Sequence, residues 1–260
     1  MNNPKDSIPM AGAPSEPPPA ERMQMRLMRI LHELKVPLIA IRGATQLLEK
    51  ELSQRELQTR YDYLGDISSW CQLMARLLDN TQLSCQSGSL EMSFDVEATM
   101  VYANILIPII RQSRLLMEAR GFRQSRIITL GFDHLPPVFI DRNKMQQVFF
   151  NLLNNAIKYA EDDPEAFRVE IEAQQLQEHF LITFRDWGIG IPEGFENAIF
   201  EEGVRAPNAI RKDVSGCGLG LWVVQNIVAA HGGTVSVSSL RQPTTFTIQL
   251  PASIQYRGRR

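Results

Sequence analysis

The segment Asn151-Leu152-Leu153-Asn154-Asn155-Ala156-Ile157-Lys158-Tyr159 contains two asparagines, Asn151 and Asn155, that are four residues apart. On an α-helix this spacing places both amides on one face, one turn apart. The apolar residues between them supply a second face that can pack on a sheet. Amide oxygens beside the Lys158 ammonium suit a Mg2+-bound polyphosphate, because Mg2+ prefers oxygen ligands. Taken alone, the segment fits a purely structural asparagine pair equally well.

Two glycine-rich segments follow this helical segment. Arg185-Asp186-Trp187-Gly188-Ile189-Gly190 comes directly after an apolar run, residues 180–184, that is typical of a strand. A carboxylate at a strand end can accept from an exocyclic amine, and Gly-x-Gly lets the backbone approach a flat ligand. Ser215-Gly216-Cys217-Gly218-Leu219-Gly220 leads into a helical pattern, where free N–H groups at the helix start can bind phosphate. Together the segments indicate a nucleotide site.

The order of these three motifs resembles the catalytic ATP-binding domain of sensor histidine kinases, in the ATPase superfamily shared with gyrase, Hsp90 and MutL. The glycines lack the Lys-Ser/Thr of a Walker P-loop and do not open on the first strand as in a Rossmann fingerprint. The resemblance implies that Asp186 selects adenine, that Asn155 and Asn151 hold Mg2+, and that Lys158 approaches the phosphates of ATP. The full set of implied cofactor-binding residues is Asn151, Asn155, Lys158, Tyr159, Asp186, Gly188, Gly190, Gly216, Gly218, Leu219 and Gly220.

Composition excludes several other classes of protein. The chain has 260 residues and a net charge of -2, enough for one or two domains and without the bulk charge that favours nucleic acid. No apolar run approaches the roughly 20 residues of a membrane-spanning helix, and no signal peptide is visible. We therefore expect a cytoplasmic protein without direct membrane insertion. Its cysteines have neither metal-ligand spacing nor a disulfide framework: Cys71, Cys85 and Cys217.

Residues 22–85 carry a heptad pattern in two segments. Apolar residues alternate steps of four and three from Leu27 to Leu52, and a second seam runs from Leu57 to Leu78. The short polar junction between the seams predicts an antiparallel helical hairpin. A lone hairpin cannot bury both seams well, so we expect two copies to form a dimeric four-helix bundle.

His32 lies beside the first seam, in Leu31-His32-Glu33-Leu34-Lys35-Val36-Pro37-Leu38. A neutral imidazole can attack a phosphoryl group, and an adjacent carboxylate can accept its other N–H. A His-Glu pair on a protein surface more commonly belongs to a solvated helix face and has no catalytic role. This stretch, however, resembles the phosphoacceptor box of histidine kinases. The resemblance implies that His32 is the phosphorylated histidine and Glu33 its acidic partner.

Two positions depart from that family box. Leu31 stands where serine is common, and Val36 stands where the family commonly has Thr or Asn. In the family, the polar residue at the second position is implicated in positioning water for dephosphorylation of the partner response regulator. Valine has no hydrogen-bonding group on its side chain, so we expect weak phosphatase activity.

The expected fold class is α+β, in which the helical hairpin of the dimeric four-helix bundle precedes an α/β sandwich ATP-binding domain of the histidine kinase/gyrase/Hsp90 superfamily. The expected organisation is a disordered Pro-rich arm or linker at 1–21, the hairpin at 22–85, a hinge at 86–95, the catalytic domain at 96–252 and a basic tail at 253–260.

Within the catalytic domain, residues 96–120 read as one amphipathic helix despite Pro108. Asp141 is a candidate N-cap for the helix that carries the asparagines. Strands are predicted at 126–130, 136–141, 167–173, 180–184, 234–238 and 244–250.

Residues 192–216 show no periodic pattern, and a loop of this length inside a compact domain is usually functional. We expect a mobile lid over ATP, with Phe200 matching a family box weakly and with one or more of Arg205, Arg211 and Lys212 near the phosphates. A solvated charged loop is the alternative. Trp187 and Trp222 either flank the nucleotide or pack in the core.

The resemblance implies phosphoryl transfer from ATP to His32, and from there to an aspartate on the receiver domain of a response regulator. The implied partners are a second copy of the chain, that regulator and a separate sensor or upstream domain. The departures at Leu31 and Val36 leave open a dimeric pseudokinase or scaffold that modulates a partner kinase or regulator. A conformational ATPase of the gyrase or Hsp90 kind lacks support, because such proteins do not need His32.

Overall fold

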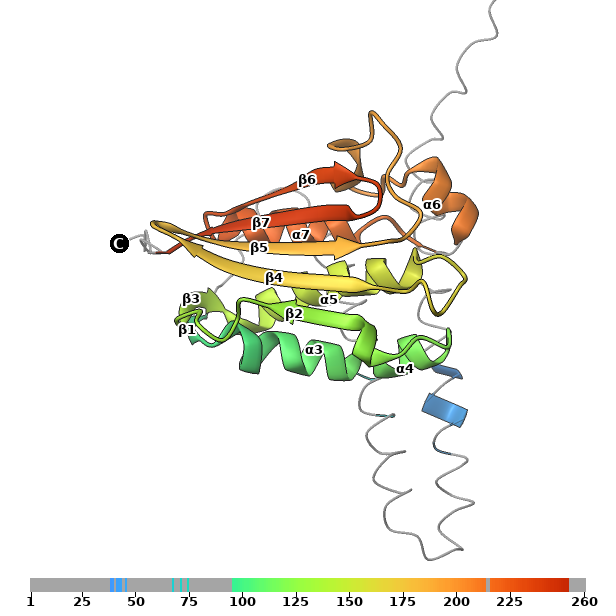
Figure 1. Ribbon diagram of the computed structural model, residues 1–260, viewed down its shortest axis with the longest axis horizontal. Coiled ribbons are helices and arrows are strands. Elements are labelled where there is room, and N and C mark those ends of the chain that lie inside the picture. Colours follow the sequence, from blue (N-terminus) through green and yellow to red (C-terminus); the bar gives the residue numbers. More distant parts are fainter. Residues whose placement is uncertain are drawn as a thin grey trace, which may run out of the picture.

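The computed structural model describes residues 38, 39, 41–43, 45, 67, 71, 74, 95–213 and 216–252 of the chain (Figure 1). The described residues that precede 95 are all helical. The predicted hairpin as a whole, its pairing into a dimeric bundle, and both His32 and Glu33 lie outside the described residues. Within the part of the chain that is described, no helix combines the length and the apolar character needed to cross a membrane.

A five-stranded mixed sheet forms the centre of the described structure. Its strand order is β2 (Ile127–Leu130), β4 (Val169–Leu176), β5 (His179–Asp186), β7 (Thr244–Pro251) and β6 (Thr234–Leu240). The β2–β4 pair is parallel and the other three pairs are antiparallel. The strands predicted from the sequence are all present, with bounds that differ by a few residues.

A second, two-stranded sheet pairs β1 (Val96–Thr99) with β3 (Val138–Asp141) in antiparallel register. The prediction of one helix over 96–120 is therefore wrong. After β1 come a π-helical segment η1 (Val101–Leu106), then α3 (Ile107–Gln112) and α4 (Arg114–Glu118). Pro108 has no N–H to donate, which fits its place in the first turn of α3, where the π-helical segment passes directly into the α-helix. The backbone of β1 finds its partner some forty residues further along the chain, which local periodicity does not reveal.

Two long helices, α5 (Arg142–Lys158) and α7 (Gly220–Ala230), cover one face of the large sheet and lie behind it in Figure 1. The apolar face of α5 packs on alternating residues of the strands; the rings of Phe149 and Phe184 meet edge to face with centroids 5.1 Å apart. The buried residues that α5, α7 and the sheet contribute to this core include Met145, Val148, Phe149, Leu153, Ile157, Ile171, Phe180, Ile182, Phe184, Val223, Val224, Ile227, Ile248 and Leu250.

Candidate active site

The start of α5 is fixed by Asp141, as predicted. Its Oδ1 accepts a hydrogen bond from the backbone N–H of Lys144 at 2.9 Å, the geometry of an N-cap. Its Oδ2 accepts from the N–H of Asp95 at 3.0 Å, and its own N–H donates to Nε2 of His231 at 3.0 Å. Asp141 therefore ties β1, α5 and the end of α7 together, and this sets the rotation of α5 that aims its asparagines.

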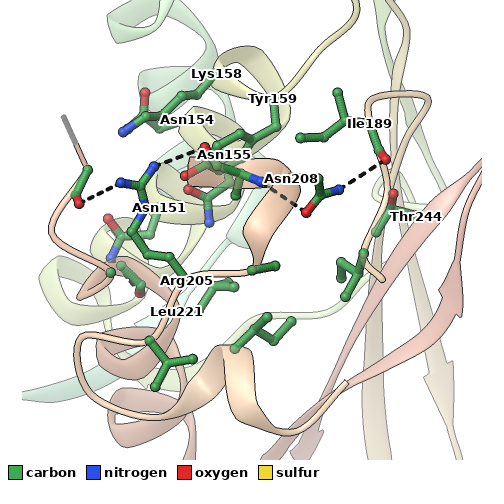
Figure 2. Close-up of a pocket in the computed structure, with 18 of the residues that line it drawn as sticks. Asn151, Asn154, Asn155, Lys158, Tyr159, Ile189, Arg205, Asn208, Leu221 and Thr244 are labelled. Atoms are coloured by element: carbon green, nitrogen blue, oxygen red, sulfur yellow. Dashed lines mark hydrogen bonds between the residues drawn. The ribbon is translucent and has the colours of Figure 1, made fainter. Parts of the chain in front are cut away.

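The last two turns of α5 carry Asn151, Asn154, Asn155 and Lys158 toward the same side (Figure 2). Asn151 is buried, and its Nδ2 donates to the carbonyl oxygen of Gly220 at 3.3 Å, which joins α5 to the start of α7. Within residues 95–213 and 216–252, Asn155 makes no side-chain hydrogen bond. The Asn155 amide is thus available to a ligand, whereas the Asn151 amide is already engaged on its donor side.

Asp186 is the last residue of β5 and lies opposite Thr244 in the β5–β7 pair. Burial of its carboxylate raises the pKa of Asp186 to about 6, although the Gly188 N–H donates to Oδ1 at 3.0 Å and favours the charged form. The nearby Thr244 hydroxyl also favours the charged form, yet it is buried without a partner at hydrogen-bond geometry among the described residues. A buried carboxylate beside an unsatisfied hydroxyl is suited to a ligand that brings donor and acceptor groups.

Two glycines permit close backbone approaches around the site. A Cβ at Gly188 would lie 2.4 Å from the Tyr159 carbonyl oxygen, and the following N–H, of Ile189, donates to that same oxygen at 3.0 Å. Gly218 has a φ of +73°, and a Cβ there would lie 2.7 Å from the carbonyl carbon of Gly203. Gly188 therefore packs the loop after β5 onto the end of α5, and Gly218 packs the second glycine segment onto Gly203.

The segment predicted to lack regular structure contains two short helices, η3 (Ala198–Phe200) and α6 (Pro207–Lys212). Phe200 is buried, and its ring meets that of Phe246 edge to face at 6.4 Å between centroids. Figure 1 shows α6 beside the end of the sheet where β5 finishes. The segment is therefore anchored in the core at Phe200, and α6 covers the end of the sheet.

Two of the three predicted cations of this segment, Arg205 and Lys212, are paired with groups of the protein itself, whereas Arg211 is exposed on α6 and does not line the pocket. Arg205 donates from Nη1 to the Gly216 carbonyl oxygen at 3.0 Å and from Nη2 to that of Ala209 at 3.0 Å. Lys212 forms an ion pair with Asp162. Lys158 of α5 lies with its Nζ 2.7 Å from Oδ2 of Asp213, directly after α6. The carboxylate of Asp213 thus stands beside the ammonium that the sequence assigns to the phosphates.

A single pocket brings most of the predicted residues together (Figure 2). All the predicted cofactor-binding residues except Gly188 line it. The lining residues are Asn151, Asn154, Asn155, Lys158, Tyr159, Asp186, Ile189, Gly190, Ile191, Ile199, Val204, Arg205, Ala206, Asn208, Ala209, Gly216, Cys217, Gly218, Leu219, Gly220, Leu221, Thr244 and Phe246.

Several of these lining residues were not expected from the sequence. Thr244 reaches the pocket because the register of the β5–β7 pair places it opposite Asp186. The sequence does not reveal this register, so it does not predict that the two residues are neighbours. Asn208 lies on α6 within the segment that showed no pattern. The two tryptophans do not line the pocket: Arg168 stacks on Trp187 at 4.6 Å from the ring centroid, and Trp222 packs against the core.

The donor set fits a nucleotide with Mg2+. One end of the pocket has the buried carboxylate of Asp186 and the buried hydroxyl of Thr244. The other end has Lys158 beside the backbone of the second glycine-rich segment. Within the described residues, no group of three His, Cys, Asp or Glu side chains is placed to hold a metal. A metal here would depend on the amide oxygen of Asn155, with Asn151, and on phosphate oxygens, a set that suits Mg2+.

Comparison with known proteins agrees with this geometry. Residues 140–254 match the family described as histidine kinase-, DNA gyrase B- and HSP90-like ATPases. The chain is 33% identical over 233 residues to the adaptive-response sensory kinase SasA of Prochlorococcus marinus strain MIT 9215. The chain therefore contains an ATPase domain of this family and is similar to a sensory kinase over most of its length. The aligned region is 88% of this chain and 58% of SasA, so the chain spans a little over half the length of that relative.

Solved structures of histidine kinases share the fold of this chain. Full-length ShkA in complex with AMPPNP has a TM-score of 0.56 and 21% identity, covering 90% of this chain and 46% of ShkA. Histidine kinase ThkA in complex with the response regulator protein TrrA has a TM-score of 0.51 and 21% identity, covering 92% of this chain and 65% of that one. At these identities the likeness establishes the α/β ATPase fold.

Proposed function

We propose that the chain is an ATP-dependent protein histidine kinase that phosphorylates His32 and passes the phosphoryl group to an aspartate of a response regulator. The observation that carries the proposal is the pocket, in which Asp186, Asn155 and Lys158 meet Gly216, Gly218 and Gly220 from separate parts of the chain. An apolar cavity with one desolvated carboxylate at one end and a cation at the other suits adenine joined to phosphates.

The residues of the pocket take distinct parts in this proposal. The Asp186 carboxylate accepts from the adenine amine, and Thr244 meets a second polar atom of the base edge. Lys158 and the backbone N–H groups of the Gly216 to Gly220 segment hold phosphate oxygens. Asn155, with Asn151, would hold Mg2+, which when bound neutralises charge on the phosphates.

The chemistry is a pair of balanced phosphoryl transfers. The neutral imidazole of His32 attacks the γ-phosphorus of ATP, the new P–N bond forms as the P–O bond to ADP breaks, and Glu33 takes up the charge that develops on the ring. An aspartate oxygen of the regulator then attacks phosphorus, the P–N bond breaks, and the imidazole is restored. We expect little phosphatase activity, because Val36 offers no group to hold a water.

The partner assignments rest on relatives. The fold-related ThkA was solved with the response regulator protein TrrA, which supports a regulator partner for this chain. The homodimer through residues 22–85, the upstream sensor and the cytoplasmic location remain predictions from the sequence. Light scattering of the purified chain tests the dimer directly, and a monomer at micromolar concentration would contradict it.

Autophosphorylation tests the proposal. The parent is incubated with γ-labelled ATP and Mg2+ beside His32→Gln and Asn155→Ala. Asn143→Ala is the matched asparagine control, because Asn143 lies on the same helix, is exposed and does not line the pocket. We expect acid-labile, base-stable label on the parent, none on the first two variants, and retained label on the control. Label that persists in His32→Gln would show that another residue accepts the phosphoryl group.

A parent chain that binds ATP but takes no label would favour the pseudokinase or scaffold. Direct titration of ATP by calorimetry separates that outcome from a chain that does not bind nucleotide at all. In the latter case the ATP site itself would be wrong.

A further inference from the structure

The side chain of Asn208 makes three hydrogen bonds at the wall of the pocket (Figure 2). Its Nδ2 donates to the carbonyl oxygen of Gly190 at 2.8 Å and to that of Ile189 at 3.3 Å. Its Oδ1 accepts from the backbone N–H of Ala209 at 2.9 Å. One amide therefore connects α6 with the Gly-x-Gly loop that follows Asp186.

The same short helix is held on its other side by Arg205. Nη2 of Arg205 donates to the Ala209 carbonyl oxygen, while Nη1 donates to that of Gly216, each at 3.0 Å. Asn208 and Arg205 thus link α6 to both glycine-rich segments, to Gly190 on one side and to Gly216 on the other. These two segments are the base end and the phosphate end of the proposed ATP site.

The loop that Asn208 contacts has little freedom to compensate. Gly190 has a φ of +73°, and a Cβ there would lie 2.8 Å from the Leu240 carbonyl oxygen. The neighbouring N–H of Ile191 donates to that same Leu240 oxygen at 2.9 Å. Backbone contacts hold this loop to the sheet. The Asn208 amide therefore holds α6 in place against the loop, and the loop does not depend on α6 for its position.

We propose that Asn208 is a positioning residue for nucleotide binding. It sets the place of α6 relative to the loop after β5, so that the base end and the phosphate end of the pocket are aligned before ATP arrives. Preorganisation of this kind increases affinity, because the entropy cost of ordering these segments is met during folding and does not reduce the free energy of binding. The inference rests on the proposed ATP function and adds a residue that neither the motifs nor the family resemblance picks out.

A purely local role for Asn208 is the competing explanation. Its Oδ1 accepts from Ala209 N–H, so it could serve only to stabilise the first turn of α6. Asn208→Asp separates the two. Aspartate keeps the acceptor for Ala209 and is favourable near a helix start, but it cannot donate to the Ile189 and Gly190 carbonyls.

The experiment measures the Kd for ATP by calorimetry and the KM and kcat of autophosphorylation. The variants are Asn208→Ala, Asn208→Asp and, as a control on the same helix, Ile210→Ala, whose side chain is exposed and does not line the pocket. We expect Kd and KM to rise roughly five- to twentyfold in both Asn208 variants, the loss of one or two hydrogen bonds. At saturating ATP, kcat should stay within about twofold of the parent value. The variants weaken ATP binding equally in the ground state and the transition state and leave the reacting groups unchanged. The control should match the parent.

Two results would overturn the inference while the ATP site stands. Parent-like affinity in Asn208→Asp with weak affinity in Asn208→Ala would assign the side chain to helix capping. Parent-like affinity in both variants would mean that it has no part in binding. A parent chain that binds no ATP would instead refute the proposed function, so the two failures are distinguishable.

Discussion

The backbone N–H of Asp141 donates to Nε2 of His231 at 3.0 Å, which joins the start of α5 to the end of α7. The other ring nitrogen, Nδ1, lies 2.7 Å from the Ile227 carbonyl oxygen and donates to it, so Nε2 is the acceptor and the ring is neutral. Burial lowers the pKa of His231, although the Ile227 carbonyl and the charge of Asp141 oppose the shift. Protonation would turn Nε2 into a donor facing another donor.

This contact predicts a loss of stability in acid. Because the pKa of His231 is lower in the folded chain than its ordinary value, its contribution is present above about pH 6.5 and is lost as the pH falls through the folded pKa. We expect His231→Phe to cost about 1–3 kcal/mol at pH 8, since it leaves the buried Asp141 N–H unpaired. Urea denaturation from pH 8 to 5 measures both effects. A variant that loses stability with falling pH as steeply as the parent would exclude this histidine as the cause.

Asp186 predicts a pH dependence of nucleotide binding. Its pKa of about 6 means that the carboxylate becomes protonated below that pH and then no longer accepts fully from the adenine amine. We expect the Kd for ADP to rise roughly tenfold per pH unit below 6. Calorimetric titrations at pH 7.5, 6 and 5 measure this rise.

Asp186→Asn is the control for protonation of the nucleotide itself. It should bind more weakly at pH 7.5 and show only the pH dependence that belongs to the ligand. The linkage to stability has the opposite sign to that of His231. A raised carboxyl pKa stabilises the free protein below about pH 3.8, and this contribution is lost as the pH rises through 6. If parent and variant show the same pH profile, the carboxylate is not the titrating group.

The ion pair between Lys158 and Asp213 predicts a variant with tighter binding. Oδ2 of Asp213 lies 2.7 Å from Nζ, and both side chains are about three-quarters buried. A phosphate that pairs with Lys158 must displace this carboxylate. We expect Asp213→Asn to lower the Kd for ADP about two- to fivefold, in keeping with a partly screened pair. Asp162→Asn, which removes a surface partner of Lys212, is the matched control. Weaker binding in Asp213→Asn would indicate that Asp213 supports the bound state.

Val36 predicts slow dephosphorylation of the partner regulator. Purified receiver domain, phosphorylated in advance, is incubated with and without the chain, and the remaining label is followed with time. We expect little acceleration by the parent and a clear increase with Val36→Thr, which supplies a hydroxyl able to hold a water. Val36→Ala serves as the apolar control. Strong acceleration by the parent would contradict the prediction.

The sequence by itself determined the elements whose signals are local. The i, i+4 asparagines, the N-cap at Asp141 and the alternation in the strands all act over a few residues, so α5 and the large sheet were predicted with small errors in their bounds. The same holds for the site residues of the three motifs, because each motif lies at the end of a regular element. These residues line one pocket with the exception of Gly188, which packs on Tyr159.

Only the tertiary structure decided what depends on distant partners. Val96–Thr99 is a strand because β3 pairs with it, although its own pattern suited a helix. Thr244 reaches the site through register with Asp186, and Asn208 does so through carbonyls at residues 189 and 190. Backbone carbonyls and strand registers carry no signature in the sequence, since every residue offers the same peptide group. Which backbone groups a side chain contacts is fixed only when the strands have paired and α6 has packed at the end of the sheet.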